Sequence, residues 1–270
     1  MEAERAWRAR LPRLADRCAE LGSLEFGEPF TGGTASLVLA ARLPNGAEAV
    51  LKLSFPHRES EHEADALARW DGAGAVRLLA HDRKRTALLL ERCRPGSPLS
   101  DLPALEALDV FAGLVSRLAV PAGAGFRTLA DEAAWWMSYL PERWKRSEPD
   151  LLRAAMDALG ELSHTQGEQV LVHQDVHAGN VLRAEREPWL VIDPKPLIGE
   201  REFALAPIVR GRELGHSEEA VCTRLEWLSA ELGLDRERAR GWALGQTMAW
   251  AEGEHVAEHL ETARWLASTA

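Results

Sequence analysis

The sequence predicts an α+β fold of two lobes, a small N-terminal lobe built on an antiparallel sheet and a larger, mainly helical C-terminal lobe. Short apolar runs bounded by glycine and by Asn45-Gly46 occur before residue 92, a pattern typical of strands joined by tight turns. Helical periodicity dominates after residue 100. Pro95-Gly96-Ser97-Pro98 separates the two patterns. We therefore expect an N-terminal lobe over 1–92, a hinge over 93–99 and a C-terminal lobe over 100–270.

The N-terminal lobe is expected to begin with an amphipathic helix. Between Trp7 and Leu21 apolar residues recur at the spacing of one helical face, and Gly22 is a suitable stop. A second helix is expected over 58–70. Apolar runs predict strands at 24–30, 37–41, 49–53, 76–80 and 86–91. The predicted order is strand, strand, strand, helix, strand, strand.

The C-terminal lobe is expected to be mostly helical. Helical patterns cover 102–119, 129–146, 150–166, 218–232 and 235–267, the last broken near Gly253. Two short apolar runs, 170–172 and 189–192, are exceptions and predict buried strands. They flank the polar segment 173–180, which is therefore the first candidate for the active site.

The composition excludes several classes of protein. Acidic residues outnumber basic ones by 42 to 32, and the net charge of -10 opposes binding to nucleic acid. No apolar run of membrane-spanning length and no signal-peptide pattern occurs. The three cysteines Cys18, Cys93 and Cys222 predict neither a disulfide framework nor a zinc finger. We expect a cytoplasmic monomer that binds no membrane and acts on a small molecule.

Segment 173–180 contains the residue types that phosphoryl transfer requires. Asp175 precedes Asn180 by five residues, the spacing of a catalytic loop in which the aspartate accepts the substrate proton and the asparagine binds magnesium. Asp193 ends the apolar run 189–192 and is the expected second magnesium ligand. An alternative takes His173, Asp175 and His177 as metal ligands on one face of a strand, but it leaves Asn180 and Asp193 unexplained.

A lysine in the N-terminal lobe supports the same chemistry independently. Lys52 lies in the middle of a predicted strand among apolar neighbours, where an ammonium group needs a partner. The phosphates of ATP and a glutamate of the following helix would provide one. A lysine that reaches solvent along its own side chain is the alternative.

The segments His173-Gln174-Asp175-Val176-His177-Ala178-Gly179-Asn180 and Ile192-Asp193-Pro194-Lys195-Pro196 resemble the catalytic loop and magnesium-binding segment of the aminoglycoside phosphotransferase and choline kinase group. Gln174 replaces the glycine usual in that group. Across nearly the whole chain the sequence is similar to the subgroup of streptomycin 6-phosphotransferases and hydroxyurea kinases. The segments that carry this similarity are 70–79, 89–92, 95–96, 129–131 and 187–195.

The resemblance implies a protein-kinase-like fold that uses ATP and Mg²⁺, and it extends the candidate site. Glu63 would pair with Lys52, and the turn containing Gly32, Gly33, Thr34 and Ser36 would close over the phosphates, although an ordinary hairpin turn is the alternative. The Glu91 carbonyl and the Cys93 amide would meet the adenine edge. Lys195 would either neutralise charge near the transferred phosphoryl group or pair with a carboxylate. For His177 a role in bracing the loop is preferred.

The substrate implied by the resemblance is an aminoglycoside-type, streptomycin-like antibiotic, phosphorylated on a hydroxyl to confer resistance. Such a cationic substrate needs carboxylates, and the candidates are those of Asp131, Glu254 and Glu258, together with the aromatic side chain of Trp135. A solvated helix face is the alternative for the glutamates, and a position in the core is the alternative for Trp135. A kinase for hydroxyurea or for a metabolite such as an amino sugar is a second hypothesis. A nucleotide-binding pseudokinase is a third, and the joint presence of the predicted lysine, base and metal ligands argues against it.

Overall fold

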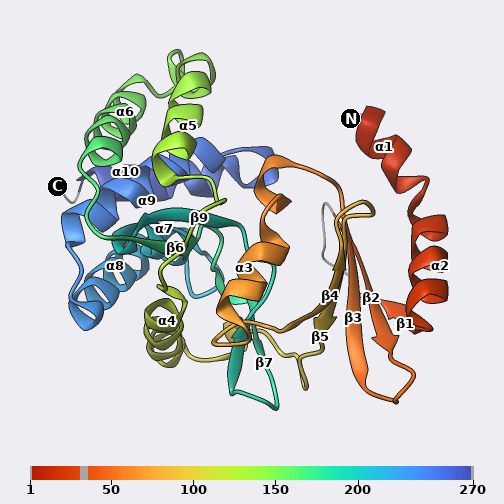
Figure 1. The fold of residues 1–270 in the computed structure, drawn as a ribbon. Coiled ribbons are helices and arrows are strands. Elements are labelled where there is room, and N and C mark those ends of the chain that lie inside the picture. Colours follow the sequence, from red (N-terminus) through yellow and green to blue (C-terminus); the bar gives the residue numbers. More distant parts are fainter. Residues whose placement is uncertain (1, 31–35, 269–270) are drawn as a thin grey trace. The chain divides into compact units, whose positions relative to one another are not determined.

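The computed structural model describes residues 2–30 and 36–268 (Figure 1). An antiparallel sheet of five strands is followed by a mostly helical remainder, which confirms the predicted α+β class. Within the described residues, no helix has both the length and the apolar character needed to span a bilayer.

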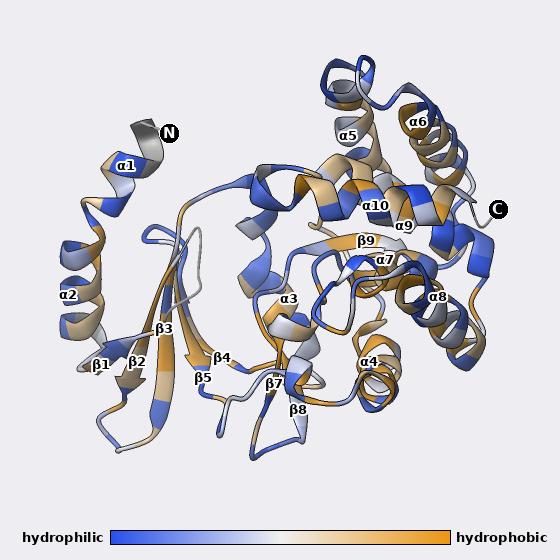
Figure 2. Ribbon diagram, turned by 180° about the vertical axis from the view of Figure 1, so that it is seen from behind, coloured by the Kyte–Doolittle hydropathy of each residue, from blue (hydrophilic) through white to orange (hydrophobic). Residues whose placement is uncertain are grey.

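The N-terminal sheet has the strand order β1-β2-β3-β5-β4, and all paired neighbours run antiparallel. Asn45 and Gly46 form the β2–β3 turn as predicted: the Asn45 side chain accepts from the Ala47 N–H, and Gly46 has a φ of 84°. β3 and β5 are apolar over most of their length (Figure 2). The strands are β1 Glu25–Pro29, β2 Ser36–Arg42, β3 Glu48–Ser54, β4 Leu78–Asp82 and β5 Ala87–Glu91.

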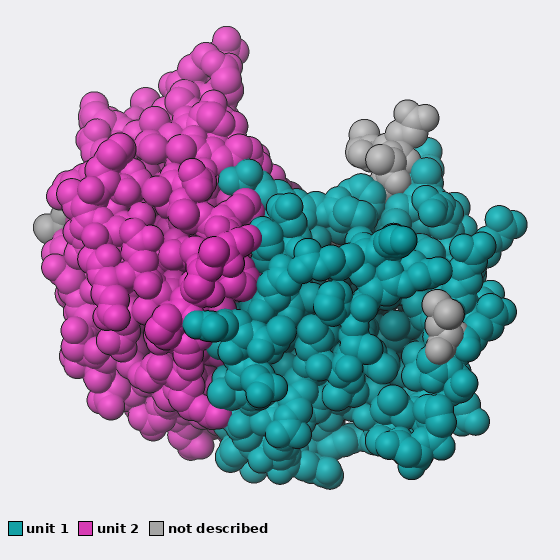
Figure 3. Space-filling model, viewed as in Figure 1, with its two compact units in different colours: residues 1–96, 183–192 teal, residues 97–182, 193–270 magenta. Residues whose placement is uncertain are grey.

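The chain divides into two compact units (Figure 3). The first comprises 1–96 together with 183–192, and the second comprises 97–182 together with 193–270. The segment 183–192, which lies in sequence between Asn180 and Asp193, is therefore part of the same unit as the five-stranded sheet.

The predicted first helix is two helices, α1 (Glu2–Arg8) and α2 (Leu11–Gly22). Pro12 lies in the first turn of α2, where a missing N–H costs nothing, and a proline there starts a new helix rather than continuing the previous one. Ala15 and Cys18 of α2 pack in one core with Leu51 and Leu53 of β3. α2 thus covers one face of the sheet.

The predicted helix over 58–70 is also shorter than expected. It consists of the 3₁₀ turn η1 (Arg58–Ser60) and the helix α3 (Glu63–Trp70). Glu63 is the first residue of α3, and Glu63, Ala66, Leu67 and Trp70 are its buried side chains. The buried face of α3 therefore carries one carboxylate at its beginning.

The second unit contains the five predicted helical segments, and the break near Gly253 separates two helices as expected. The short helix α7 was not predicted. The helices are α4 Ala104–Leu118, α5 Leu129–Trp144, α6 Pro149–His164, α7 Ala206–Arg210, α8 Glu218–Leu232, α9 Arg236–Trp250 and α10 Val256–Ser268. The second unit also contains the 3₁₀ turns η2 Leu99–Asp101, η3 Ala178–Asn180, η4 Arg201–Leu205 and η5 Gly253–His255.

The predicted strands β6 (Gln169–His173) and β8 (Trp189–Val191) are present, but each pairs with a strand that was not predicted. β6 pairs antiparallel with β9 (Pro196–Glu200), and β8 pairs with β7 (Val181–Arg183). His173, the last residue of β6, faces Pro196, the first residue of β9. This pairing brings the start of segment 173–180 beside Lys195.

Candidate active site

The segment 173–180 is held by backbone and side-chain hydrogen bonds within the second unit. His173 is 2% exposed, and its Nδ1 accepts the Asp175 N–H at 2.9 Å. The fully buried Gln174 donates its N–H to the Lys195 carbonyl at 3.0 Å, while its own carbonyl accepts from Gln246 Nε2 at 2.8 Å. The backbone of Gln174, which replaces the glycine usual in the related kinases, is therefore bound on both sides, whereas its side-chain Oε1 and Nε2 are buried without a hydrogen-bond partner among the described residues.

Asp175 is 9% exposed, and two cations contact its carboxylate. Lys195 Nζ lies 2.9 Å from Oδ2, and Arg210 Nη2 lies 3.5 Å from Oδ1. Of the two roles considered for Lys195, pairing with a carboxylate is the one seen in this geometry. The sequence reasoning did not single out Arg210.

Asn180 and Asp193, the predicted magnesium ligands, lie in the same unit as Asp175. Asn180 Nδ2 donates to the Asp175 carbonyl at 3.0 Å, an arrangement that directs the amide oxygen away from this bond. Asp193 has a φ of 53°, a left-handed conformation that is uncommon outside glycine and that occurs at functional sites. Carboxylate and amide oxygens are the ligand types that Mg²⁺ prefers.

His177 forms a close pair with Glu213, whose Oε1 lies 2.5 Å from the imidazole Nδ1. Burial alone would lower the pKa of His177, but the hydrogen bond to Glu213 and the charge of Asp175 outweigh it and raise that pKa. Burial opposes ionisation of Glu213, yet the His177 hydrogen bond and charge lower its pKa to about 2. The His177–Glu213 pair therefore braces the loop, and the rings of His173 and His177 use their Nδ1 atoms for separate partners, the Asp175 N–H and the Glu213 carboxylate.

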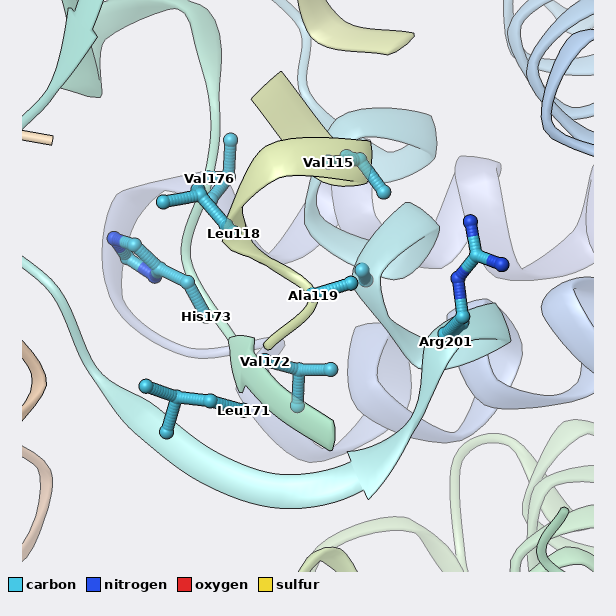
Figure 4. A pocket seen from close by; sticks show the side chains of 9 residues that line it. Val115, Leu118, Ala119, Leu171, Val172, His173, Val176 and Arg201 are labelled. Carbon is cyan, nitrogen blue, oxygen red and sulfur yellow. The ribbon is translucent and has the colours of Figure 1, made fainter. Parts of the chain in front are cut away.

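His173 and Val176 of segment 173–180 line a small cavity (Figure 4). It measures about 10 Å³, enough for one water molecule at most, and Val115, Leu118, Leu171 and Val176 are among the side chains that line it. A cavity of this size cannot hold a substrate. Val176, 3% exposed, belongs to the apolar support of the loop.

In the first unit Lys52 and Glu63 form a buried ion pair, with Nζ 2.6 Å from Oε1. Lys52 is 6% exposed and Glu63 2% exposed, so both charges are largely removed from solvent. The structure thus places together the two residues that the resemblance paired. Ser36 is the first residue of β2, whereas Gly32, Gly33 and Thr34 lie outside the described residues.

Glu91 ends β5, and its side chain binds the segment 183–192. Arg186 donates through Nε and Nη2 to the two Glu91 oxygens at 2.8 and 2.9 Å, and the Arg77 N–H donates to the same carboxylate at 3.0 Å. Arg186 also donates to the carbonyls of Gly72 and Ala75.

Burial, with Glu91 nearby, raises the pKa of Cys93 to about 12, so this thiol stays protonated.

The predicted substrate residues do not gather in one cluster of contacts. Asp131 is exposed at the start of α5, where its carboxylate and N–H both bond to Thr128, the N-cap residue. Trp135 is 40% exposed and stacks edge-on against Tyr139 with ring centroids 5.2 Å apart. Glu254 is exposed beside His255, and Glu258 pairs with Arg212 at 3.4 Å.

Residues 24–254 match the family model described as "Aminoglycoside/hydroxyurea antibiotic resistance kinase". This match covers well over half of the chain. The chain belongs to this family. The predictions of the family, of the kinase-like fold and of an antibiotic-modifying phosphotransferase are confirmed.

Two relatives in this kinase family are similar over most of the chain. A hydroxyurea phosphotransferase of Kitasatospora aureofaciens is 43% identical over 247 residues, which cover 88% of this chain and 71% of the relative. A streptomycin 6-kinase of Streptomyces griseus is 38% identical over 258 residues, covering 92% of this chain and 84% of the relative. Both relatives are named for a small-molecule acceptor, in keeping with the expected small-molecule substrate.

Solved structures confirm the fold of this resistance kinase. The choline kinase LicA from Streptococcus pneumoniae matches with a TM-score of 0.69 at 14% identity, covering 96% of this chain and 99% of LicA. A thermostable mutant of aminoglycoside phosphotransferase APH(4)-Ia, in a ternary complex with ADP and hygromycin B, matches with a TM-score of 0.60 at 16% identity. The match covers 94% of this chain and 95% of the APH(4)-Ia chain. A protein with this fold thus holds an adenine nucleotide, in keeping with ATP as the phosphoryl donor.

Proposed function

We propose that this kinase transfers the γ-phosphoryl group of ATP to a hydroxyl of a streptomycin-like aminoglycoside and thereby confers resistance. The observation that carries the proposal is the arrangement at the end of β6, where Asp175 is fixed next to Asn180 and Lys195. The similarity to streptomycin 6-kinases over 92% of the chain supports this choice of acceptor.

In this proposal Asp175 accepts the hydroxyl proton and orients the oxygen for attack. Lys52, held by Glu63, contacts the α- and β-phosphates. The backbone N–H groups of the turn with Gly32, Gly33, Thr34 and Ser36 bind phosphate oxygens, and the Glu91 carbonyl and the Cys93 amide bind the adenine edge.

Asn180 and Asp193 would hold Mg²⁺ through one amide oxygen and one carboxylate. The bound ion would neutralise charge that develops on the transferred phosphoryl group. Lys195 already carries a positive charge at the Asp175 carboxylate, and it would add to this neutralisation.

We propose that the cationic groups of the acceptor meet exposed acidic and aromatic side chains of the second unit. Trp135 is accessible on α5, and the Glu254 side chain is 87% exposed. Asp131 and Glu258 are the remaining candidates, although each also bonds within the protein. We further propose that the enzyme is a monomer and that it acts in the cytoplasm, whose reducing conditions suit the free thiols of Cys18, Cys93 and Cys222.

A hydroxyurea kinase is the second candidate, and two observations favour it. The hydroxyurea phosphotransferase is 43% identical, more than the streptomycin 6-kinase reported above. The side chains that contact Asp175 are cations, Lys195 and Arg210, which suits a small neutral acceptor better than a cationic one near this carboxylate.

The deciding experiment is a coupled assay of ADP release with streptomycin, hydroxyurea and amino sugars as acceptors, in the presence of Mg²⁺. ADP release that depends on streptomycin supports the first proposal, and release that depends on hydroxyurea alone supports the second.

Asp175→Asn should lower kcat by about 10² to 10⁴. Asp150→Asn, at an exposed aspartate of α6, is the control and should keep wild-type kcat. A protein that releases no ADP with any acceptor and gains no thermal stability from MgATP would instead be a scaffold.

A further inference from the structure

Trp250, the last residue of α9, lies against two cations at once. Arg210 Cζ is 4.5 Å from the centroid of its ring, and Lys195 Nζ is 4.9 Å away. Both distances are within the range in which the negative face of an indole attracts a cation.

The same two cations contact Asp175, one at each carboxylate oxygen. Lys195 Nζ is 2.9 Å from Oδ2, and Arg210 Nη2 is 3.5 Å from Oδ1. The side chain of Arg210 is only 9% exposed and that of Lys195 21%, so water screens neither charge well. Lys195, Arg210 and Trp250 come from three different segments, the turn before β9, the end of α7 and the end of α9.

Long side chains lose several rotamers when they are fixed, and two cations that share a carboxylate repel one another. An aromatic face that contacts both cations offsets part of the lost rotamer freedom and part of the repulsion between them. The carboxylate of Asp175 then has a defined plane, because each of its oxygens has its own cation. An oxygen that accepts a substrate proton needs such a fixed orientation.

We propose that Trp250 is a positioning residue, whose ring holds Lys195 and Arg210 against the two oxygens of Asp175 and thereby orients that carboxylate. This inference rests on the proposed function, in which Asp175 is the base. Trp250 itself touches neither substrate nor nucleotide in this scheme and acts through the two cations.

The first test compares Trp250→Leu with Trp250→Phe, which keeps an aromatic face. Trp250→Leu should lower kcat about tenfold with the KM values for ATP and acceptor within about twofold of wild type, and Trp250→Phe should restore at least about a third of the wild-type kcat. Trp265→Leu is the control, because Trp265 of α10 packs against His216, 5.0 Å between ring centroids, and contacts neither cation. Equal losses in Trp250→Phe and Trp250→Leu, or a loss confined to KM, would overturn the proposal.

A double-mutant cycle tests whether Trp250 acts through its cations. If it does, the double variant Trp250→Leu/Arg210→Met should have a clearly higher kcat than is obtained by multiplying the fractions of the wild-type kcat that the two single variants retain. Independent, multiplicative effects would contradict the proposal.

The same cycle measured by urea unfolding does not depend on turnover. Coupling of Trp250→Leu and Arg210→Met by about threefold or more in the unfolding equilibrium constant supports the contact, and additive effects reject it. If the wild-type enzyme turned over none of the acceptors, the proposed function would fail while this cycle still decided whether Trp250 holds Arg210.

Discussion

Arg186 clamps Glu91 through two parallel hydrogen bonds, Nε to Oε1 at 2.8 Å and Nη2 to Oε2 at 2.9 Å, across 95 residues of sequence. Planar, charge-assisted pairs of this kind are among the stronger hydrogen bonds in proteins. Glu91 ends β5, and Arg186 lies in the segment between Asn180 and Asp193. The clamp therefore fixes that segment to the strand whose end is the proposed adenine contact.

Replacing Arg186 should destabilise the protein and weaken nucleotide binding. The two side chains are 21% and 18% exposed, so Arg186→Ala leaves a partly buried carboxylate without its guanidinium, at a cost of about 2 kcal/mol. We expect a lower urea midpoint and a several-fold higher KM for ATP. Arg186→Lys should recover only part of the loss, because lysine cannot form both bonds.

A matched control for the Arg186 variants is Arg153→Ala on α6. Its partner Asp150 and Arg153 itself are 85% and 72% exposed, and a pair so open to water should contribute nothing measurable. Equal destabilisation by the two alanine variants would show that the clamp has no special role.

Lys52→Met should abolish most activity and also destabilise the first unit. The substitution leaves the Glu63 carboxylate, 2% exposed, without its lysine, at an expected cost of about 3 kcal/mol. The double variant Lys52→Met/Glu63→Leu should recover stability, because it removes both buried charges, yet remain inactive with ATP. Chemical unfolding and the ADP-release assay separate these effects, and a double variant with restored activity would exclude the proposed phosphate contact of Lys52.

His259 of α10 should make the protein less stable in acid. Burial, together with the charges of Arg210 and His255, lowers the pKa of His259 to about 4. The folded state thus binds this proton less readily than the unfolded state, whose pKa is near 6.5, and the stability contributed above pH 6.5 is lost as the pH falls towards 4. Between pH 7 and 4.5 the wild type should lose about 2 kcal/mol more than His259→Gln. Parallel stability curves for the two proteins would contradict the assignment.

The parts of the site that the sequence predicted are those set by short spacing or by the type of a neighbouring residue. Asp175 and Asn180 are five residues apart on one loop, and Lys52 stands out because apolar strand residues surround it. β7 and β9 escaped prediction because β7 is only three residues long and β9 begins within Pro194-Lys195-Pro196, which reads as a loop. Prolines are tolerated at the first position of a strand, and Pro196 occupies that position.

Long-range partners could not be predicted in the same way. Arg210 is 35 residues from Asp175, and Arg186 is 95 residues from Glu91, so no local periodicity connects them. An arginine in a polar stretch looks the same in sequence whether it is solvated or clamps a carboxylate. Two glutamates of α10 also have distant partners, since Glu258 pairs with Arg212 and Glu261 with His216, 46 and 45 residues away in sequence. These carboxylates already have partners within the protein.

Two glycines in paired helices should respond to alanine in opposite directions. A Cβ at Gly245 of α9 would lie 2.5 Å from Leu159 of α6, whose side chain is fully buried, so Gly245→Ala forces apart two helices that pack closely. We expect destabilisation of about 1–3 kcal/mol. Gly160 of α6 is next to Leu159 in sequence, but a Cβ added there would meet no atom within 4 Å, and Gly160→Ala should stabilise by roughly 0.5–1 kcal/mol through helix propensity. Urea unfolding of both variants measures the difference, and a stabilising Gly245→Ala would show that α6 and α9 can separate without cost.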